Sequence, residues 1–519
     1  MLAFLLAAVG FAATALAGEP RFEDDGAGLP VEHVYGGGWE HFVGGGVAVL
    51  DCDEDGFPDF YAAGGENPAR LFRNKSKQGG ALTFALADAP ELALTGVTGA
   101  YPLDIDSDGT LDLFVLRAGA NAVFRGLGGC RFERTEEAWH IDPGNSWSTA
   151  FAAAWGPGDQ WPTLAVGNYV DRDDPNGPFG TCSKHQLFRP GSDGGYKEPE
   201  TIEPGYCALS MLFTDWSGGG EDDLWVSNDR HYYVRIGQEQ LFKVWPALHE
   251  FGDGEGWQKQ KLWGMGLASR DLDGDGRPEI AVTSMADQKL FTLDGKKGSA
   301  HFSAIAFARG MTAQLPYAGG DGRPSTGWHV QFGDVDNDGM DDLFISKGNV
   351  DQMPDAAMHD PNNLLMQQAD GRFVEAGLTA GIGSYERGRG AALTDLNRDG
   401  LLDLIVVNRR APLMLYRNRT EDTGNWIKLR LAQASGNCNA IGARIELEAG
   451  GKRHFHEILV GGGHAGGQAG YDHFGLGKAD TVRFRVRWPD GAMSDWTDAA
   501  ANGHYRVQRD GGGLIVTAE

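Results

Sequence analysis

Five short acidic segments hold the residues of this chain whose types and spacing could do chemistry. In each segment acidic or amide side chains stand at the first, third, fifth and ninth positions, and glycine stands at the sixth. Such a loop can surround a hard cation with oxygen atoms, and the glycine permits the sharp reversal of the backbone that this requires. Residues 334–342 give a clear copy, with Asp334, Asp336, Asp338 and Asp342. The spacing therefore predicts metal binding.

We expect the metal to be calcium, because each loop offers many oxygens on flexible side chains, whereas magnesium keeps several waters and takes few protein ligands. The segment resembles the first nine residues of an EF-hand loop. Ile345, however, stands where that loop has a bidentate glutamate, and an apolar run replaces the second helix. A connection between two strands is therefore predicted. The alternative is a solvated turn, but carboxylates spaced so closely repel one another without a cation.

Copies of this loop recur along the chain, and one gap between them, from residue 112 to residue 271, is long enough for two more. Two degenerate copies lie there. One has lost nearly all its ligands, and the other keeps Asp215, Ser217 and Asp223 but has Gly219 at position five. In chain order the copies are loop 1 (51–59), loop 2 (104–112), loop 3 (155–163), loop 4 (215–223), loop 5 (271–279), loop 6 (334–342) and loop 7 (395–403).

The predicted calcium ligands are the side chains at positions one, three, five and nine of the five intact loops, together with the residue at position seven, whose backbone carbonyl completes the set. At positions one, three, five and nine every residue is acidic except Asn397 of loop 7. The predicted ligands are Asp51, Asp53, Asp55, Phe57, Asp59, Asp104, Asp106, Asp108, Thr110, Asp112, Asp271, Asp273, Asp275, Arg277, Glu279, Asp334, Asp336, Asp338, Met340, Asp342, Asp395, Asn397, Asp399, Leu401 and Asp403.

Strands must position these loops. A small-residue strand precedes each loop, an apolar strand follows it, and a third strand that often ends in a basic residue comes next, as in Arg70-Leu-Phe-Arg. Seven such units predict an all-β fold, a seven-bladed β-propeller. An open solenoid is the alternative. The chain has 78 glycines, which suits many short strands joined by tight turns.

The spacing breaks after about residue 420, and a second pattern begins. Residues 426–431, 441–447, 454–460 and 481–488 alternate polar and apolar side chains, which predicts a small antiparallel β-sandwich. Four histidines in this part could form a metal or catalytic site, although hydrogen-bonded structural histidines within a tight glycine turn are the alternative. They are His454, His456, His464 and His473.

The net charge and the N-terminal segment limit the kinds of partner and the location expected for the protein. The chain has 72 acidic and 45 basic residues, a formal charge of -27 that repels phosphate backbones and argues against nucleic-acid binding. Residues 1–17 are interpreted as a cleaved signal peptide, with an uncleaved anchor as the alternative. No other segment is apolar over the length of a membrane span. We expect a soluble monomer that is secreted, periplasmic or held at the cell surface.

Five cysteines are too few for a disulfide framework in so long a chain. Cys182 and Cys207 lie 25 residues apart in a loop-rich segment, and an exported protein permits a bridge between them. Cys52, Cys130 and Cys438 are expected to be packed or free thiols, although their spacing does not exclude a pair between Cys52 and Cys130.

The repeats resemble FG-GAP, or VCBS, repeats of the integrin-like seven-bladed propeller, which implies calcium in the loops. The C-terminal part resembles the ASPIC/UnbV domain. Together they resemble a bacterial member of the cartilage acidic protein family, which implies a propeller over residues 35–420, a sandwich over residues 425–515 and an exported, calcium-binding, adhesive or matrix-associated protein. The motifs of the C-terminal resemblance are Asn425-Trp426, Ala440-Ile-Gly-Ala-Arg444, Gly461-Gly-Gly-His-Ala-Gly-Gly-Gln468, His473-Phe-Gly-Leu-Gly477 and Trp488-Pro-Asp-Gly491.

No nucleophile elbow, phosphate loop or paired-acid motif is recognisable. The expected function is therefore recognition or adhesion, without catalysis, of an extracellular protein or glycan. The alternative is an enzyme acting on a polysaccharide or metabolite in the propeller channel. Long loops are candidate contact surfaces. They are residues 171–207, 228–233 and 349–355, and Arg230, Tyr232, Tyr233 and Trp263 are suited to sugars or peptides.

Overall fold

The structure is a computed structural model of the 519-residue chain. It describes residues 18–175, 180–192, 194–229, 236–285, 288–296, 298–311, 325–350, 360–434 and 436–519. These residues form β-strands and four 3-10 turns but no α-helix. The turns are η1 (Gly26–Gly28), η2 (Trp39–His41), η3 (Pro90–Leu92) and η4 (Asp253–Glu255). The predicted all-β class is confirmed.

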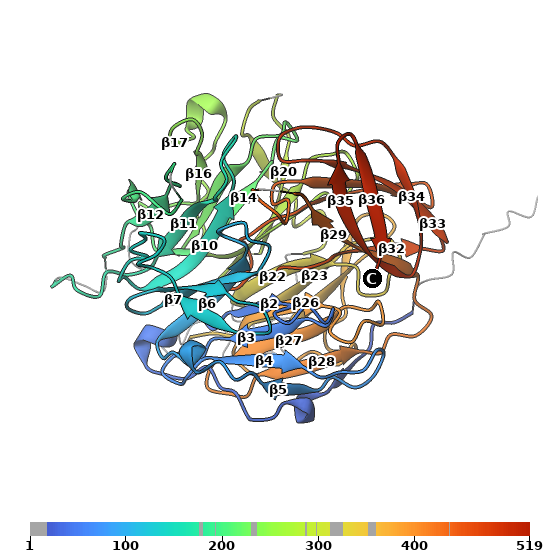
Figure 1. Cartoon of the computed structure of the whole chain (residues 1–519), viewed down its shortest axis with the longest axis horizontal. Helices are drawn as coiled ribbons and strands as arrows, with labels where there is room; N and C mark the ends of the chain where they lie inside the picture. Colours follow the sequence, from blue (N-terminus) through green and yellow to red (C-terminus); the bar gives the residue numbers. More distant parts are fainter. Residues whose placement is uncertain are drawn as a thin grey trace, which may run out of the picture.

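Seven four-stranded antiparallel sheets, one for each repeat, make up the larger part of the fold. We call them blades and number them by their loops. The inner strand of each blade contacts the inner strands of the two neighbouring blades, and the inner strand of blade 7 contacts that of blade 1. The ring is therefore closed, as a propeller requires and an open solenoid does not (Figure 1).

The strands of each blade follow one another outward from the axis. The inner strands are β2 (Val47–Leu50), β6 (Val97–Leu103), β10 (Ser148–Ala154), β14 (Ala208–Thr214), β18 (Gly264–Arg270), β22 (Gly327–Gly333) and β26 (Gly388–Thr394). The second strands are β3 (Asp59–Ala62), β7 (Asp112–Arg117), β11 (Thr163–Asn168), β15 (Asp223–Asn228), β19 (Glu279–Ser284), β23 (Asp342–Lys347) and β27 (Asp403–Asn408). Each acidic loop therefore joins an inner strand to a second strand.

The third strands are β4 (Arg70–Asn74), β8 (Ala122–Gly126), β12 (His185–Phe188), β16 (Gln240–Lys243), β20 (Lys289–Leu293), β24 (Asn363–Gln367) and β28 (Met414–Asn418). A short fourth strand, which the sequence did not reveal, forms the outer edge of each blade. In blades 1 to 6 these strands are β5 (Phe84–Leu86), β9 (Phe132–Arg134), β13 (Glu200–Ile202), β17 (His249–Glu250), β21 (Phe302–Ala304) and β25 (Phe373–Glu375).

Blade 7 takes its outer strand from the other end of the chain. β1 (Phe22–Asp24) pairs with β28 in antiparallel register, Phe22 opposite Asn418. The propeller therefore includes residues well before the expected start at residue 35. This closure joins the first and last parts of the ring through backbone hydrogen bonds, so that no blade edge is left open there.

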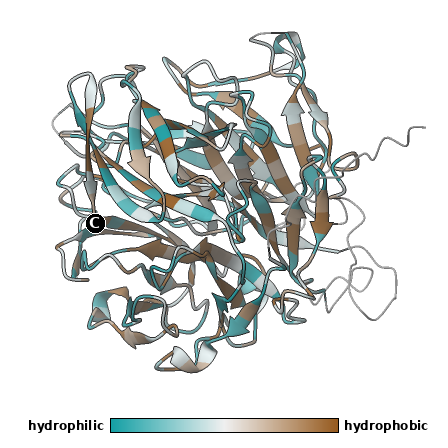
Figure 2. Ribbon diagram, turned by 90° about the vertical axis from the view of Figure 1, so that its right-hand side faces the viewer, coloured by the Kyte–Doolittle hydropathy of each residue, from teal (hydrophilic) through white to brown (hydrophobic). Residues whose placement is uncertain are grey.

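Apolar side chains fill the spaces between blades. The second strands are buried over most of their length because each blade packs between two others, which explains their continuous apolar runs. In blade 2, for example, Leu113 and Val115 join the core shared with blade 1, whereas Phe114 and Leu116 join the core shared with blade 3. Figure 2 shows apolar residues mostly on the strands and hydrophilic residues mostly on the connections.

The C-terminal strands form two four-stranded sheets around a separate core that includes Ile427, Ile445, Phe484 and Val507. The predicted sandwich is present, and Figure 1 shows it, in red, against one part of the propeller. It is not wholly antiparallel, because β29 and β35 pair in parallel. The strands are β29 (Asn425–Ala432), β30 (Arg444–Ala449), β31 (Lys452–Glu457), β32 (Asp472–Gly477), β33 (Thr481–Arg487), β34 (Thr497–Ala500), β35 (Gly503–Asp510) and β36 (Gly513–Ala518).

Residues 458–470, which we call the axial segment, leave the sandwich after β31 and enter the axis of the propeller. They form isolated β-bridges with Val49 of blade 1, Ala100 of blade 2, Ala153 of blade 3 and Leu267 of blade 5. One expectation from the sequence is therefore wrong, because the strand expected over 454–460 ends at residue 457. The glycine run does contain a turn, at residues 464–465, and its other backbone groups bond to the inner strands.

The glycines explain how two backbones can lie so close. A Cβ atom on Gly99 of β6 would be 1.8 Å from the carbonyl oxygen of Ala465, and a Cβ atom on Gly46 would be 1.7 Å from the same atom. At the tip of the segment His464 Nε2 accepts the N–H of Gly44 at 3.1 Å. Chain from the sandwich therefore occupies part of the axis of the ring, beside a cavity that inner-strand residues such as Leu267 and Val330 also line.

Candidate metal centres

Six of the seven loops share one backbone conformation. Position four has φ between 56° and 72°, and position six, always glycine, has φ between 81° and 95° in loops 1, 2, 4, 5, 6 and 7. The left-handed region at position six favours glycine because it lacks a Cβ atom. Loop 4, which has lost two acidic ligand positions, keeps this conformation. The backbone shape is therefore set by the blade and does not need all the carboxylates.

The loop amides hold the first and ninth carboxylates in place. In loop 6 Asp334 Oδ2 accepts the N–H of Gly339 at 2.7 Å, and Asp342 Oδ2 accepts the N–H of Val335 at 3.0 Å. The residue at position seven donates its N–H to the carboxylate at position five in all five intact loops. The carboxylates are thus oriented before any ion binds. The ligand role of the position-seven carbonyls stays a prediction.

Four loops bring three acidic groups together so that one oxygen of each lies within 4.8 Å of the others. They belong to blades 1, 2, 5 and 6. The groups are Asp51, Asp53 and Asp59; Asp104, Asp106 and Asp108; Asp271, Asp273 and Glu279; and Asp334, Asp336 and Asp342. An all-oxygen ligand set of this kind fits a hard cation such as calcium. In these four loops the spacing found in the sequence corresponds to a compact cluster in space.

Loop 6 lies beneath the sandwich. The N–H of Gly424 donates to Asp336 O at 2.9 Å, and the N–H of Gly477 donates to Asn337 O at 2.8 Å. Asp334, Asp336 and Asp342 are each at most 6% exposed. Within the described parts of the chain, none of the four predicted ligand aspartates of loop 6 forms an ion pair, whereas Asp341 of the same loop lies 3.7 Å from Arg270 Nε. Burying this many carboxylates without a counter-ion lowers the stability of the folded protein. We therefore expect a bound cation to stabilise loop 6 more than any other loop.

The exposed loops carry basic partners from their own blades. Arg125 Nε lies 2.8 Å from Asp106 and its Nη2 lies 2.7 Å from Asp108, while Arg73 pairs with Asp53 in blade 1. Both arginines lie on third strands. The basic residue found there in the sequence therefore pairs with the acidic loop in these two blades.

Loop 7 has a different charge environment. Lys428 Nζ of the sandwich lies 3.3 Å from Asp395 Oδ2, and both side chains are buried. Asn397 Nδ2 donates to Asp399 Oδ2 at 3.0 Å. Burial raises the pKa of Asp395, but the neighbouring Lys428 ammonium and the nearby His504 ring bring it below its ordinary value. Asp395 is thus ionised beside a cation that the protein itself supplies.

Burial raises the pKa of ligands in the other loops, to about 6 for Asp51 and Asp104 and to about 7 for Glu279 and Asp338. Metal-free folded protein therefore binds more protons than unfolded protein between about pH 4 and pH 7, and its stability falls as the pH rises through that window. Calcium keeps the loops ionised and removes this loss. We expect the difference in melting temperature between calcium and chelator to widen from about pH 5 to pH 7.5. A constant difference would contradict the assignment.

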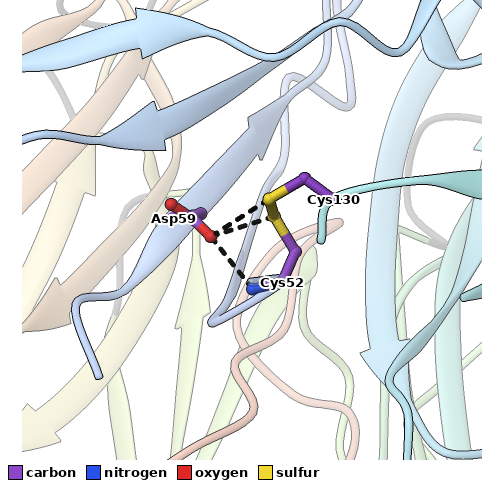
Figure 3. Close-up of side chains that lie close together, drawn as sticks. All are labelled: Cys52, Asp59 and Cys130. Carbon is purple, nitrogen blue, oxygen red and sulfur yellow. Dashed lines mark hydrogen bonds between the residues drawn. A yellow bond between two sulfur atoms is a disulfide. The ribbon is translucent and has the colours of Figure 1, made fainter. Parts of the chain in front are cut away.

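Cys52, at position two of loop 1, forms a disulfide with Cys130 of blade 2. Asp59 Oδ2 accepts the Cys52 N–H at 2.9 Å and lies beside both sulfur atoms (Figure 3). These cysteines are therefore not free thiols, and oxidation removes them as metal ligands. The predicted bridge between Cys182 and Cys207 is confirmed, and Cys438 is a free thiol.

The four histidines of the C-terminal part have separate structural partners. His456 Nδ1 lies 3.0 Å from Asp472 Oδ1, and His473 Nε2 lies 2.7 Å from Asn337 Oδ1. His464 lies in the axis, and the ring of His454 lies edge-on to Phe474. Across the part of the chain that the structure describes, no acidic or cysteine cluster of metal-binding size includes a histidine. This supports the interpretation as structural histidines.

The long loops are only partly described. Arg230, Tyr232 and Tyr233 lie outside the described residues, as do residues 351–355. Trp263 is half-buried against a cluster that includes Trp147 and Trp328 at the end of the axis opposite the acidic loops. Local packing, the alternative to a ligand contact, accounts for this tryptophan.

Comparison with protein families identifies both parts of the chain. A model for FG-GAP-like repeats matches residues 51–115 and 271–345, and a model named ASPIC and UnbV matches residues 433–513. The chain carries FG-GAP-like repeats and an ASPIC and UnbV domain. The FG-GAP-like matches contain loops 1, 2, 5 and 6, the four that form acidic clusters. The resemblance predicted from the sequence is confirmed.

The chain is also similar in sequence to the cartilage acidic protein 1 of several animals. Cartilage acidic protein 1 of Homo sapiens is 23% identical over 493 residues, which cover 86% of this chain and 69% of that protein. The Mus musculus protein is 26% identical over 235 residues, 44% of this chain and 34% of that protein. The match therefore spans about a third of the mouse protein's length.

The similar solved structures are more distant in sequence. BBS1N in complex with ARL6DN is 11% identical, covers 79% of this chain and 99% of that chain, and has a TM-score of 0.43. A lectin of Agrocybe aegerita is 14% identical, covers 72% of this chain and 93% of that chain, and has a TM-score of 0.40. Among the residues described for this chain, none forms a helix able to cross a membrane.

Proposed function

We propose that this chain is an exported, calcium-binding protein that recognises an extracellular protein or glycan and does not catalyse a reaction. The partial occupation of the axis by the axial segment is the observation that carries this proposal. The competing enzyme hypothesis places a reaction chamber in the channel. The axial segment occupies part of that space and forms β-bridges with four blades, which restricts the channel to the cavity described below. The similarity to cartilage acidic protein 1 and the four acidic clusters also support the proposal.

The proposed recognition surface is a cavity between the sandwich and the loop side of the propeller. Its volume is about 330 Å³, and the axial segment forms part of its wall. Glu54 and Arg131 line it from blades 1 and 2, and Asn439 and Tyr471 line it from the C-terminal part. Mixed apolar and polar linings of this size suit a small part of a glycan or peptide. Residues of both the propeller and the C-terminal domain therefore line this cavity.

Binding of the purified protein to panels of matrix proteins and glycans, with calcium and with chelator, tests the proposal. For a ligand found in this way, Arg131→Ala and Asn439→Ala should each weaken binding by about tenfold if they contact it closely. Arg134→Ala is the control, because Arg134 is exposed in the same blade and pairs with Glu136 instead. Silence across the panels, or a reproducible turnover abolished by a cavity substitution, would overturn the proposal.

A further inference from the structure

Two of the three loops that depart from the acidic pattern, loops 4 and 7, each receive a basic side chain from the sandwich within 3.3 Å of a carboxylate. Loop 5 also has an arginine of the sandwich nearby, but Arg444 Nη2 lies 3.8 Å from Asp271 Oδ2, and this loop keeps all its acidic ligands. Loop 4 receives Arg487 of β33, and loop 7 receives Lys428 of β29. In both cases the cation approaches the carboxylate at position one, Asp215 in loop 4 and Asp395 in loop 7. Both contacts join residues of different domains.

In loop 4 the guanidinium lies directly over the site. Arg487 Nη2 is 2.6 Å from Asp215 Oδ2, and Asp215 is 1% exposed. A Cβ atom on Gly220, at position six, would be 2.8 Å from Arg487 Nη1, so the guanidinium also covers the glycine turn. Loop 4 therefore keeps the backbone conformation of the intact loops, and the arginine neutralises the negative charge of Asp215.

The remaining groups of loop 4 are too few to hold a metal ion. Position three is Ser217 and position five is Gly219, neither of which carries a charge. The ninth-position carboxylate, Asp223, accepts the indole N–H of Trp216 at 2.7 Å. The arginine is therefore the cation that this loop can accommodate.

Loop 7 is an intermediate case. It keeps Asp395, Asp399 and Asp403, but the ammonium of Lys428 reaches Asp395 and the amide of Asn397 donates to Asp399. Lys428 is 3% exposed, so its charge is held inside the interface and is not screened by water. A second cation at the same carboxylate would meet this ammonium.

We propose that Arg487 and Lys428 occupy the cation positions of loops 4 and 7, so that bound metal is confined to loops 1, 2, 5 and 6. This inference rests on the proposed calcium sites of those four loops. Under this proposal the sandwich has a second role, besides placing the axial segment in the axis. Its ion pairs attach it to blades 4 and 7, and these ion pairs do not depend on the calcium concentration.

Counting the bound ions tests the proposal. The full chain should bind four calcium ions by equilibrium dialysis with elemental analysis. Lys428→Met should bind five, because Asp395 becomes available. Arg487→Met should still bind four, whereas Arg487→Met combined with Ser217→Asp and Gly219→Asp should bind five. Five or six ions in the unaltered chain would overturn this inference and leave the calcium sites intact, whereas no bound ion would overturn both.

Stability in saturating calcium provides the second measurement. Arg487→Met should lower the melting temperature by about 5 °C or more, because it leaves Asp215 buried without a counter-ion. Arg485→Met is the matched control, since Arg485 lies on the same strand and pairs with Glu446 inside the sandwich. Equal losses in the two variants would contradict a special role for Arg487, even if one of the ion-counting variants failed to fold.

Discussion

Replacing Gly99 with alanine should lower the free energy of unfolding by about 1–3 kcal/mol, because overpacking a well-packed site costs this much. The added Cβ would lie 1.8 Å from the carbonyl oxygen of Ala465, so the axial segment must move away from β6. Chemical denaturation measures the loss. Amide hydrogen exchange should be faster at Gly462, Gly463 and Ala469, whose N–H groups donate to carbonyls of the inner strands.

Gly254→Ala is the control for this experiment. Gly254 lies in η4, and a Cβ atom there would meet nothing within 4 Å. Its stability and its exchange in the axial segment should remain those of the unaltered protein. If Gly99→Ala also left both measurements unchanged, the axial segment would not be held against β6 as described.

Asp336→Asn should change stability in opposite directions with and without calcium. In chelator it should raise the melting temperature, because it removes one of several buried, mutually repelling carboxylates of loop 6. In calcium it should lower the melting temperature, because a ligand is lost. A site saturated at about 1,000 times its Kd contributes about 4 kcal/mol to stability, so the loss in calcium should be large.

The control is Asp55→Asn, at position five of the exposed loop 1. It also removes one predicted ligand, but in chelator it should change stability little, because Asp55 is exposed to water. Differential scanning calorimetry of both variants, with calcium and with chelator, measures the two signs. A melting temperature that does not respond to chelation, together with no bound calcium, would refute the metal assignment for all loops.

The acidic loops and the propeller were accessible from the sequence because each loop is a local feature. Nine consecutive residues set its turn, its glycine and its carboxylates, and repetition at similar spacing indicates radial closure. The fourth strands were missed because three residues such as those of β5 give no clear alternation. β1 was missed because its partner, β28, lies at the far end of the ring.

The long-range features gave no comparable signal. The glycines of the axial segment are typical of a turn, and the sequence does not show that they also pack against the inner strands of the propeller. Lys428 and Arg487 sit in alternating strands, where a basic residue ordinarily faces water. Lys428 pairs with loop 7 and Arg487 pairs with loop 4, and only the structure brings these residues together. The bridge between Cys52 and Cys130 likewise joins two repeats, and its spacing left other pairings open.

The position of the axial segment also limits how far the two domains can change independently of each other during evolution. Family models divide the chain into repeats and a C-terminal domain, yet the hydrogen bonds at the axis of the first belong to a peptide from the second. A propeller of this kind can accept a foreign ASPIC and UnbV domain only if its inner strands keep glycine at positions such as 46 and 99. The two parts are therefore expected to vary together, as the halves of a single core do.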